Sequence, residues 1–205
     1  MKIGILGGTS LAKALGKRFI DAGLNVVFGV RPDFDTEEAE WKIMNRLHHR
    51  ICPYESAIIQ ADFILICSEN GYLPEIWVAL KNTDTEGKMI IDCTNAKFDK
   101  KLSNGNTQLI KKAAPKAHLF KAYNNLGLDY PQSDVLGVIK ETYFCGDDVP
   151  EKLRVKRLIE VSGFNAVDVG KISNASLLEA FYHLRNEISW NKQEHQNYHF
   201  KLVSI

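Results

Sequence analysis

The sequence predicts an α/β fold in which helices cover both faces of a doubly wound, mostly parallel sheet. Strand-length apolar runs alternate with stretches of helical periodicity along most of the chain, as in successive strand–helix–strand units. The chain opens with one such unit around a glycine turn, and its last helix is followed by no strand. We therefore expect one folded domain at residues 1–172 and a C-terminal helical extension at residues 173–205.

The opening unit is a strand, a glycine turn, a helix and a second strand. Residues 2–6 (KIGIL) are an apolar run of strand length that stops at Gly7 and Gly8, where the chain turns tightly. A helix follows the turn, with apolar residues at intervals of four, and ends at Gly23. Residues 25–30 (NVVFGV) form the second strand, and units of this kind are right-handed with parallel strands.

The start of this first helix is a candidate anion site. Free N–H groups and the positive end of the helix dipole favour a phosphate there. The dinucleotide fingerprint G-x-G-x-x-G reads here as Gly7, Thr9 and Ala12, so a threonine replaces the middle glycine. Thr9 and Ser10 either offer hydroxyl groups to the phosphate or simply cap the helix. The strand–turn–helix–strand context favours a Rossmann-like, dinucleotide-binding domain.

Arg31, at the end of the second strand, indicates which dinucleotide is bound. An acidic residue at this place usually bonds the ribose of NAD, whereas an arginine accommodates the 2′-phosphate of NADP. A guanidinium also matches phosphate geometry and stays charged. NADP is therefore the predicted cofactor. The alternatives are a solvated arginine in a loop with Pro32, and contact of Asp33 with the ribose.

The remaining elements continue the same rhythm. Residues 63–67 (FILIC) are continuously apolar, as expected of a central strand covered on both faces. Further strands are expected at residues 48–52, 88–92, 118–122, 142–145 and 165–169. Further helices are expected at residues 34–47, 55–60, 73–80, 107–114, 150–161 and 174–188.

Polar or aromatic residues follow three of these strands, at residues 67–70, 94–95 and 122–124. Ligands of open α/β sheets bind beyond the carboxyl ends of strands, where the strand order reverses. The alternative is that the asparagines and serines only cap the following helices or turns. The candidate ligand contacts in these segments are Cys67, Ser68, Asn95, Ala122 and Tyr123.

Composition excludes several classes of partner. Lys and Arg number 26 against 25 Asp and Glu, and a formal net charge of +1 gives no field to attract nucleic acid or an anionic membrane. With 45% hydrophobic residues the chain forms a real core, yet it has no apolar run of membrane-spanning length and no recognisable leader. We expect a cytoplasmic protein.

Cysteines and histidines indicate neither a disulfide framework nor a metal site. The cysteines form no C-x-x-C motif and read as small buried apolar residues. They are Cys52, Cys67, Cys93 and Cys145. His48 and His49 are adjacent and cannot share one helix face, and His195 and His199 lack supporting carboxylates, so no metal is expected.

The terminal helix carries apolar residues at helical intervals. Because no strand follows it, it has three candidate roles: it covers the sheet, it roofs the ligand pocket, or it packs against a second subunit in a homodimer. The apolar residues are Leu177, Leu178, Phe181, Leu184 and Ile188.

Taken together, several segments resemble the NADPH-dependent coenzyme F420 reductases and the related oxidoreductase domain of the six-transmembrane metalloreductases (STEAP proteins). They occur in the order and spacing of that family as far as about Leu184. They are GILGGTSLAKAL, VVFGVR, IIDCTN, LFKAYNNLG, YFCGDD and GFNAVDVGKISNASLLE.

The resemblance implies a fold that binds NADP and a hydride transfer between nicotinamide and a flavin or deazaflavin. It places the pyrophosphate against Thr9, Ser10 and Leu11 beside Gly7 and Gly8, and the 2′-phosphate against Arg31. It places Ser68, Asn95, Ala122 and Tyr123 near the nicotinamide and its ribose. This chain departs from the family in having Thr9 for the usual glycine, Val30 for a serine or threonine, and SENGYLP after the central strand.

The function expected is an NADP(H)-dependent oxidoreductase with a flavin-like or small organic acceptor. Cofactor chemistry needs no acid or base from the protein, and no such catalytic set is evident. The alternative is a catalytically silent NADP-binding or sensing protein. A third candidate, a dehydrogenase of a small imine or hydroxy compound, requires a charged group facing the nicotinamide, for which Lys121 and Glu69 are the plausible residues.

Overall fold

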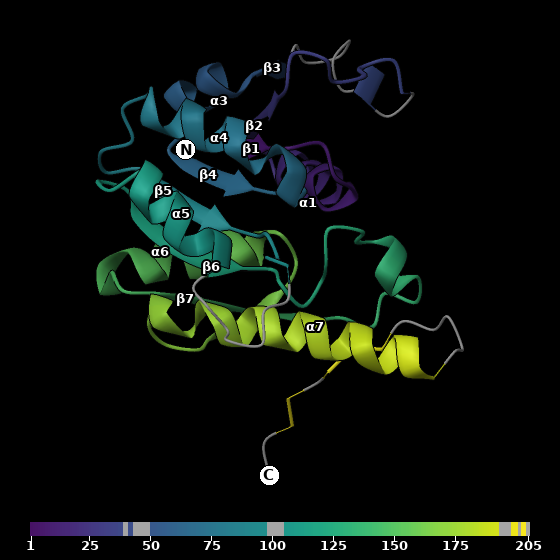
Figure 1. Cartoon of the computed structure of the whole chain (residues 1–205). Coiled ribbons are helices and arrows are strands. Elements are labelled where there is room, and N and C mark those ends of the chain that lie inside the picture. Colours follow the sequence, from purple (N-terminus) through teal and green to yellow (C-terminus); the bar gives the residue numbers. More distant parts are fainter. Residues whose placement is uncertain (39–40, 43–49, 98–104, 193–197, 201, 204–205) are drawn as a thin grey trace.

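The computed structural model describes the chain except for residues 39–40, 43–49, 98–104, 193–197, 201 and 204–205. Within the described residues, eight strands form one sheet in the order β3-β2-β1-β4-β5-β6-β7-β8 (Figure 1). All neighbouring strands are parallel except the antiparallel pair β6 and β7. The strands are β1 (Lys2–Leu6), β2 (Asn25–Val30), β3 (Ile51–Pro53), β4 (Phe63–Ile66), β5 (Met89–Asp92), β6 (His118–Ala122), β7 (Glu141–Gly146) and β8 (Asn165–Asp168).

The strand order reverses between β1 and β4. The chain builds β1, β2 and β3 in one direction and then returns to place β4 on the other side of β1. Connections that leave two such adjacent strands diverge toward opposite faces of the sheet, and a crevice opens between them. The predicted doubly wound, mostly parallel sheet is therefore confirmed.

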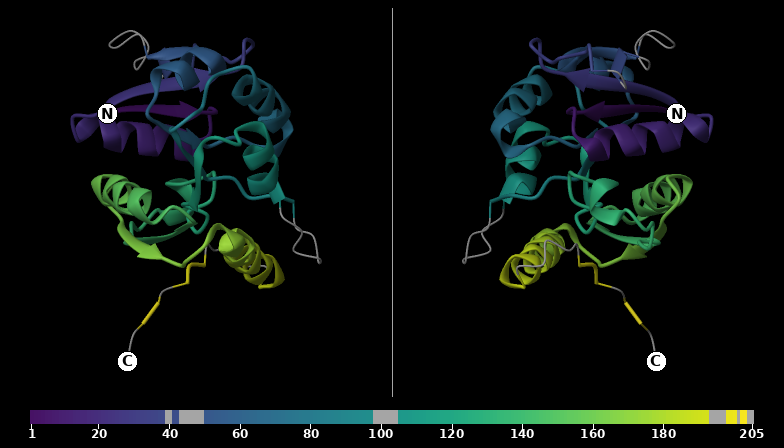
Figure 2. Two further views of the ribbon diagram at one scale, coloured as in Figure 1. Left: turned by 90° about the vertical axis from the view of Figure 1, so that its left-hand side faces the viewer. Right: turned by 90° about the vertical axis from the view of Figure 1, so that its right-hand side faces the viewer.

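Helices cover both faces of the sheet. Figure 2 shows α1 and α6 on one face and α4 and α5 on the other, and the two main hydrophobic clusters divide the helices in the same way. In α1 the predicted stripe of Leu11, Leu15 and Phe19 is fully buried against the sheet. The helices are α1 (Ser10–Asp21), α3 (Tyr54–Gln60), α4 (Leu73–Lys81), α5 (Gly105–Ala113), α6 (Val149–Val161) and α7 (Ala175–Asn191).

Most predicted elements are present. Among the elements that the structure describes completely, the predicted and observed ends differ most for α7, which was expected to end at residue 188 and continues to Asn191. The helix predicted over residues 34–47 is wrong at its start, because residues 34–38 are not helical. A turn through Pro32 brings the Phe34 N–H to the Arg31 carbonyl, 3.1 Å away, and the Phe34 ring packs edge-on against Trp41. Tertiary packing of this aromatic residue therefore replaces the predicted first turn.

Parts of three other predictions fall outside the described residues. Only residues 41–42 are described within the rest of the predicted helix, and both are helical. The strand predicted at residues 48–52 is present from Ile51, whereas His48 and His49 lie outside the described residues, as does His195.

The terminal helix α7 packs along β7 beside α5, as Figures 1 and 2 show. Leu178 and Arg185 are buried, but Leu177, Phe181 and Leu184 from the predicted apolar stripe are exposed. Among the described residues, no helix combines the length and the apolar character that crossing a membrane needs.

Candidate functional site

A small cavity lies at the crevice where the strand order reverses. Its volume is about 70 Å³, and it is lined from the turn after β1, the end of β2 and the segment after β4. Five of the predicted site residues therefore share one cavity. The lining residues are Gly7, Gly8, Thr9, Val30, Arg31, Phe34, Tyr54, Ser68, Glu69 and Tyr72.

The turn at the bottom of this cavity requires glycine. Gly7 has a φ of +114°, and a Cβ atom there would collide with the carbonyl oxygen of Cys67 on the neighbouring strand exit. The Gly7 N–H donates to the Gly29 carbonyl at 2.9 Å, which ties the turn to the end of β2. At Gly8 a Cβ would collide with the Phe34 ring, so this ring lies directly over the turn.

The residues that open α1 are already engaged by the protein. The Thr9 hydroxyl donates to the Cys67 carbonyl at 3.0 Å and accepts from the Ala12 N–H at 3.3 Å, so it is the N-cap of α1. The Leu11 N–H donates to the Leu128 carbonyl at 3.0 Å. The helix start thus retains its positive dipole, but the Thr9 side chain serves as a cap and the Leu11 N–H already has an acceptor.

Arg31 lies against two aromatic rings. Its guanidinium carbon is 4.2 Å from the centre of the Tyr72 ring and 5.5 Å from that of Phe34, and its Nε is 2.9 Å from Asp33 Oδ1. Stacking of this kind fixes the plane of a guanidinium and leaves its edges for hydrogen bonds. The side chain is only 25% exposed, so the alternative of a freely solvated arginine does not describe it.

The remaining candidates lie at the ends of β4, β5 and β6. Cys67, Ser68, Asn95 and Ala122 are all buried, and the Ser68 hydroxyl donates to the Glu69 carbonyl. Tyr123 has a φ of +66°, and its ring is buried against Phe164 with its hydroxyl 3.1 Å from Ser162 Oγ. Burial raises the pKa of Tyr123. Its side chain therefore belongs to the core, and its backbone is the part that lies at the strand end.

Lys121 is held in a buried ion cluster instead of facing a ligand. Its ammonium is 2.8 Å from Asp92 Oδ2 and 2.7 Å from Glu179 Oε1, and it donates to the Thr94 carbonyl at 2.9 Å. Burial disfavours its charge, but the two carboxylates outweigh burial and raise the pKa of Lys121. Lys121 is therefore not a charged group free to face a ligand, whereas Glu69, the other residue considered for that role, is exposed and lines the small cavity.

Sequence reasoning missed the aromatic members of this site. Phe34, Tyr54 and Tyr72 carry no motif, and Phe34 was assigned to a helix. A signal for Tyr72 was available, since it follows Asn70 and Gly71 at a strand exit that was already a candidate.

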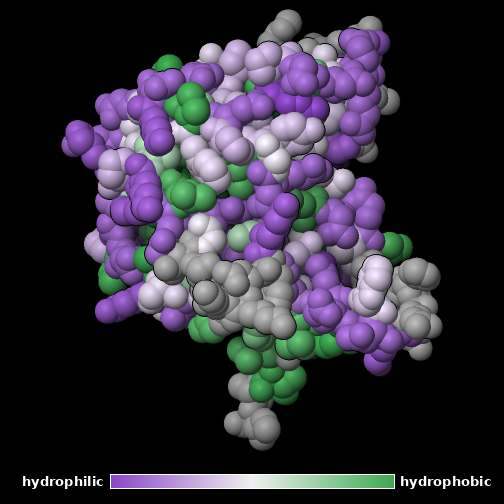
Figure 3. Space-filling model, in the orientation of Figure 1, coloured by the Kyte–Doolittle hydropathy of each residue, from purple (hydrophilic) through white to green (hydrophobic). Residues whose placement is uncertain are grey.

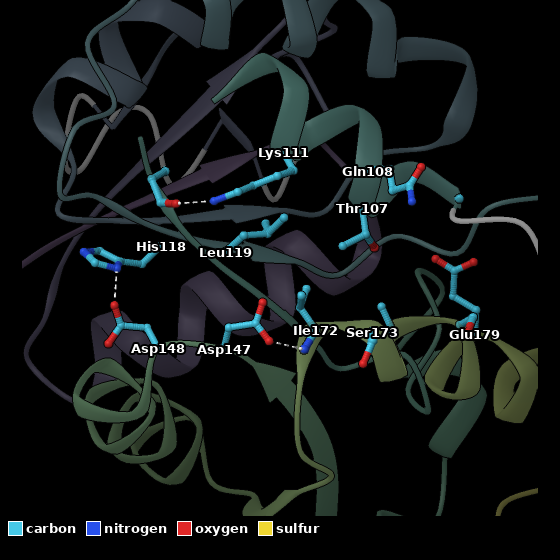
Figure 4. Close-up of a pocket in the computed structure, with 14 residues that line it drawn as sticks. Thr107, Gln108, Lys111, His118, Leu119, Asp147, Asp148, Ile172, Ser173 and Glu179 are labelled. Carbon is cyan, nitrogen blue, oxygen red and sulfur yellow. Dashed lines mark hydrogen bonds and ion pairs between the residues drawn. The ribbon is translucent and has the colours of Figure 1, made fainter. Parts of the chain in front are cut away.

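A larger cavity of about 680 Å³ lies elsewhere, between α5, β6 and the start of α7 (Figure 4). None of the predicted site residues lines it. Its carboxylates already have partners: Asp148 is 2.5 Å from His118 Nδ1, Asp147 accepts from the Ile172 N–H, and Glu179 pairs with Lys121. The motif residues thus point to the smaller cavity.

Known proteins resemble this chain in sequence and in fold. Residues 2–96 match the family described as NADP oxidoreductase, coenzyme F420-dependent. Metalloreductase STEAP2 of Mus musculus is 23% identical over 177 residues, covering 86% of this chain and 35% of the relative, and Metalloreductase STEAP3 of Rattus norvegicus is 23% identical over 181 residues, covering 87% and 36%. The chain therefore spans about a third of the length of these curated relatives.

Solved structures show the same fold. A protein of Arthrobacter sp. FB24 described as an F420-dependent NADP-reductase has a TM-score of 0.81 and 18% identity, with both chains covered completely. An imine reductase from Aspergillus terreus, solved in complex with NADPH4, has a TM-score of 0.67 and 13% identity, covering 95% of this chain and 63% of that one.

The chain has a Rossmann-like fold, and the small cavity lies where its strand order reverses. The resemblance to F420-dependent NADP reductases and to the STEAP oxidoreductase domain is confirmed, and the predicted class of enzyme, an NADP-dependent oxidoreductase, is supported by the same matches.

Proposed function

We propose that this protein binds NADP(H) in the crevice between β1 and β4 and transfers hydride between nicotinamide and a flavin-like, deazaflavin-like or small organic acceptor. The observation that carries the proposal is the meeting of the glycine turn and Arg31 in one cavity. A pyrophosphate suits the positive end of α1, and the stacked guanidinium suits a 2′-phosphate. The family match over residues 2–96 and the complex of a structural neighbour with NADPH4 support this cofactor.

Binding requires the small cavity to open. A volume of about 70 Å³ is less than a nucleotide needs, and the rings of Phe34 and Tyr72 line the space beside Arg31. We propose that these rings move aside and then stack on the adenosine half of the cofactor. Gly7 and Gly8 fit such a ligand, because neither places a side chain at the turn.

The bound nicotinamide supplies the hydride, so the chain has only to hold and orient it. We propose that the residues after β4, β5 and β6 do this at the nicotinamide end, namely Cys67, Ser68, Asn95, Ala122 and Tyr123. Holding the two reacting rings at near-attack distance in a site closed to water accelerates a reaction of this kind. Glu69 is exposed and lines the small cavity.

Binding and turnover test the proposal separately. Calorimetric titration with NADPH and NADH measures the cofactor preference, and loss of NADPH absorbance with flavins, F420 and cyclic imines measures transfer. We expect NADPH to bind more tightly than NADH and at least one acceptor to be reduced. Tight NADPH binding without turnover on any acceptor would favour the silent NADP-binding or sensing protein, and no binding of either cofactor would end the proposal.

We further propose that residues 173–205 mediate a homodimer. Exposed apolar residues gather on α7 and the described part of the tail, where Figure 3 shows hydrophobic side chains around the lower end of the molecule. Phe181 of this surface packs against the rings of Tyr143 and Phe200, which joins helix, strand and tail. Sedimentation of wild-type and Phe181→Glu protein tests the idea, since the variant should shift toward monomer. The exposed residues are Leu177, Phe181, Leu184, Phe200, Leu202 and Val203.

A cytoplasmic location is also proposed. All four cysteines are free, and three of them are buried, as expected for a protein in a reducing compartment. Microscopy of the tagged protein tests this directly.

A further inference from the structure

Two buried amide atoms at the ends of β5 and β6 have no hydrogen-bond partner among the described residues. They are Asn95 Nδ2 and Asn124 Oδ1. The two residues are only 8% and 2% exposed. Buried polar atoms are nearly always paired, so an unpaired donor and an unpaired acceptor in contacting residues require an explanation.

The orientation of both amides is fixed by their other contacts. Asn124 Nδ2 donates to the Thr94 carbonyl at 2.9 Å and to Asn95 Oδ1 at 2.8 Å. Exchanging oxygen and nitrogen in Asn124 would lose both bonds, so the assignment follows from the network. The Thr94 carbonyl is itself fixed, because it also accepts from the Lys121 ammonium at 2.9 Å.

The unpaired atoms therefore present one donor and one acceptor from two amides that are bonded to each other. A primary carboxamide has the complementary groups, a carbonyl oxygen and an NH₂, in one plane. The pair also lies at the sheet edge of the glycine turn, since β5 and β6 are parallel to β1 and β4. Both atoms are shielded from solvent, so a ligand reaches them only when the closed crevice opens.

We infer that the Asn95–Asn124 amide pair binds the carboxamide of the nicotinamide ring, with Asn95 Nδ2 donating to its oxygen and Asn124 Oδ1 accepting from its nitrogen. This inference rests on the proposed function and adds Asn124 to the cofactor site. Lys121 acts as a positioning residue, because it holds the Thr94 carbonyl that orients Asn124.

A cofactor analogue tests the assignment without any variant. In 3-acetylpyridine adenine dinucleotide phosphate a methyl group replaces the amide nitrogen, while the carbonyl is kept. Calorimetry on wild-type protein should show that NADP⁺ binds about threefold to tenfold more tightly than this analogue, the effect of one hydrogen bond. The Asn124→Leu variant should lose that preference, and Asn95→Ala should weaken both ligands equally. Adenosine 2′,5′-bisphosphate, which lacks the nicotinamide half, should bind all of these proteins alike.

Asn125→Leu is the matched control. Asn125 is the next residue and also an asparagine, but it donates to the Glu141 carbonyl and accepts from Thr142 Oγ1. This variant should keep the preference for NADP⁺. Equal binding of NADP⁺ and the analogue by wild-type protein would overturn the amide assignment while leaving the proposed function intact. Failure of wild-type protein to bind NADP⁺, the analogue and the bisphosphate would overturn both.

Discussion

Replacing Arg31 with glutamine should change the cofactor preference more than the fold. The guanidinium is stacked 4.2 Å from the Tyr72 ring centre, and its ion pair with Asp33 involves a carboxylate that is 80% exposed and easily displaced. Hydrogen bonds to a charged group contribute about 1.5–3 kcal/mol, and 1.4 kcal/mol is a factor of ten. The Kd for NADPH should therefore rise roughly tenfold to a hundredfold. The Kd for NADH should change little, because NADH has no 2′-phosphate.

Calorimetric titration of both cofactors into wild-type and Arg31→Gln protein measures this directly. Asp33→Asn is the opposite perturbation, since it removes the carboxylate that competes for the guanidinium, and it should tighten NADPH binding by about fivefold at most because an exposed pair is weak. Arg154→Gln is the control, because Arg154 lies on α6 and pairs with Glu151. Equal weakening of NADPH and NADH by Arg31→Gln would refute the reasoning, since Arg31 would then not distinguish the 2′-phosphate.

Three further changes test the framework of the site. Gly7→Ala should destabilise the fold by about 2–3 kcal/mol in urea denaturation, because φ is +114° and the added Cβ meets backbone. Gly23→Ala, whose Cβ would meet nothing, should cost only about 1 kcal/mol. Equal losses of stability in the two variants would contradict this. Lys121→Met should lower the free energy of unfolding by about 3–5 kcal/mol, because it leaves Asp92 buried without its cation. Adding Asp92→Asn to this variant should recover part of the lost stability. No recovery in the double variant would argue against a stabilising role of the ion pair. Burial raises the pKa of Tyr54 to about 12, so the unfolded chain loses this proton first and stability falls as pH rises from about 10 to 12. Tyr54→Phe should make that fall shallower by about 1–2 kcal/mol in denaturation at successive pH values, and an unchanged slope would contradict the assignment.

The fold was predictable because its signals are local and repeated. Residues 63–67 are apolar without interruption, and the buried strand β4 lies there because both of its faces are covered by helices. The glycine turn was equally readable, since only glycine tolerates the backbone of Gly7 beside the Cys67 carbonyl. These features depend on a few neighbouring residues, and a single sequence contains them.

The rest of the site depends on contacts between distant segments. The Phe34 ring contacts Gly8 and Trp41. The spacing of apolar residues along the chain does not predict contacts of this kind. Lys121 is one of the two charged residues considered for a place facing the nicotinamide, but its carboxylate partner Glu179 comes from α7, far along the chain. The sequence also could not show that the Tyr123 ring would turn into the core, because this follows from its positive φ and from Ser162.

Thr9 shows how a departure from the motif is compatible with the predicted role. In the dinucleotide fingerprint a glycine usually stands at this position, and Thr9 adds a side chain there. In the structure its hydroxyl is turned toward the protein, where it donates to the Cys67 carbonyl and caps α1 through the Ala12 N–H. The same carbonyl leaves no room for a side chain at Gly7, so the backbone of the turn packs closely against the exit of β4. The Thr9 hydrogen bond holds the turn in this position. Thr9 therefore anchors the start of α1 to the exit of β4 through two hydrogen bonds that a glycine, which has no side chain, could not make.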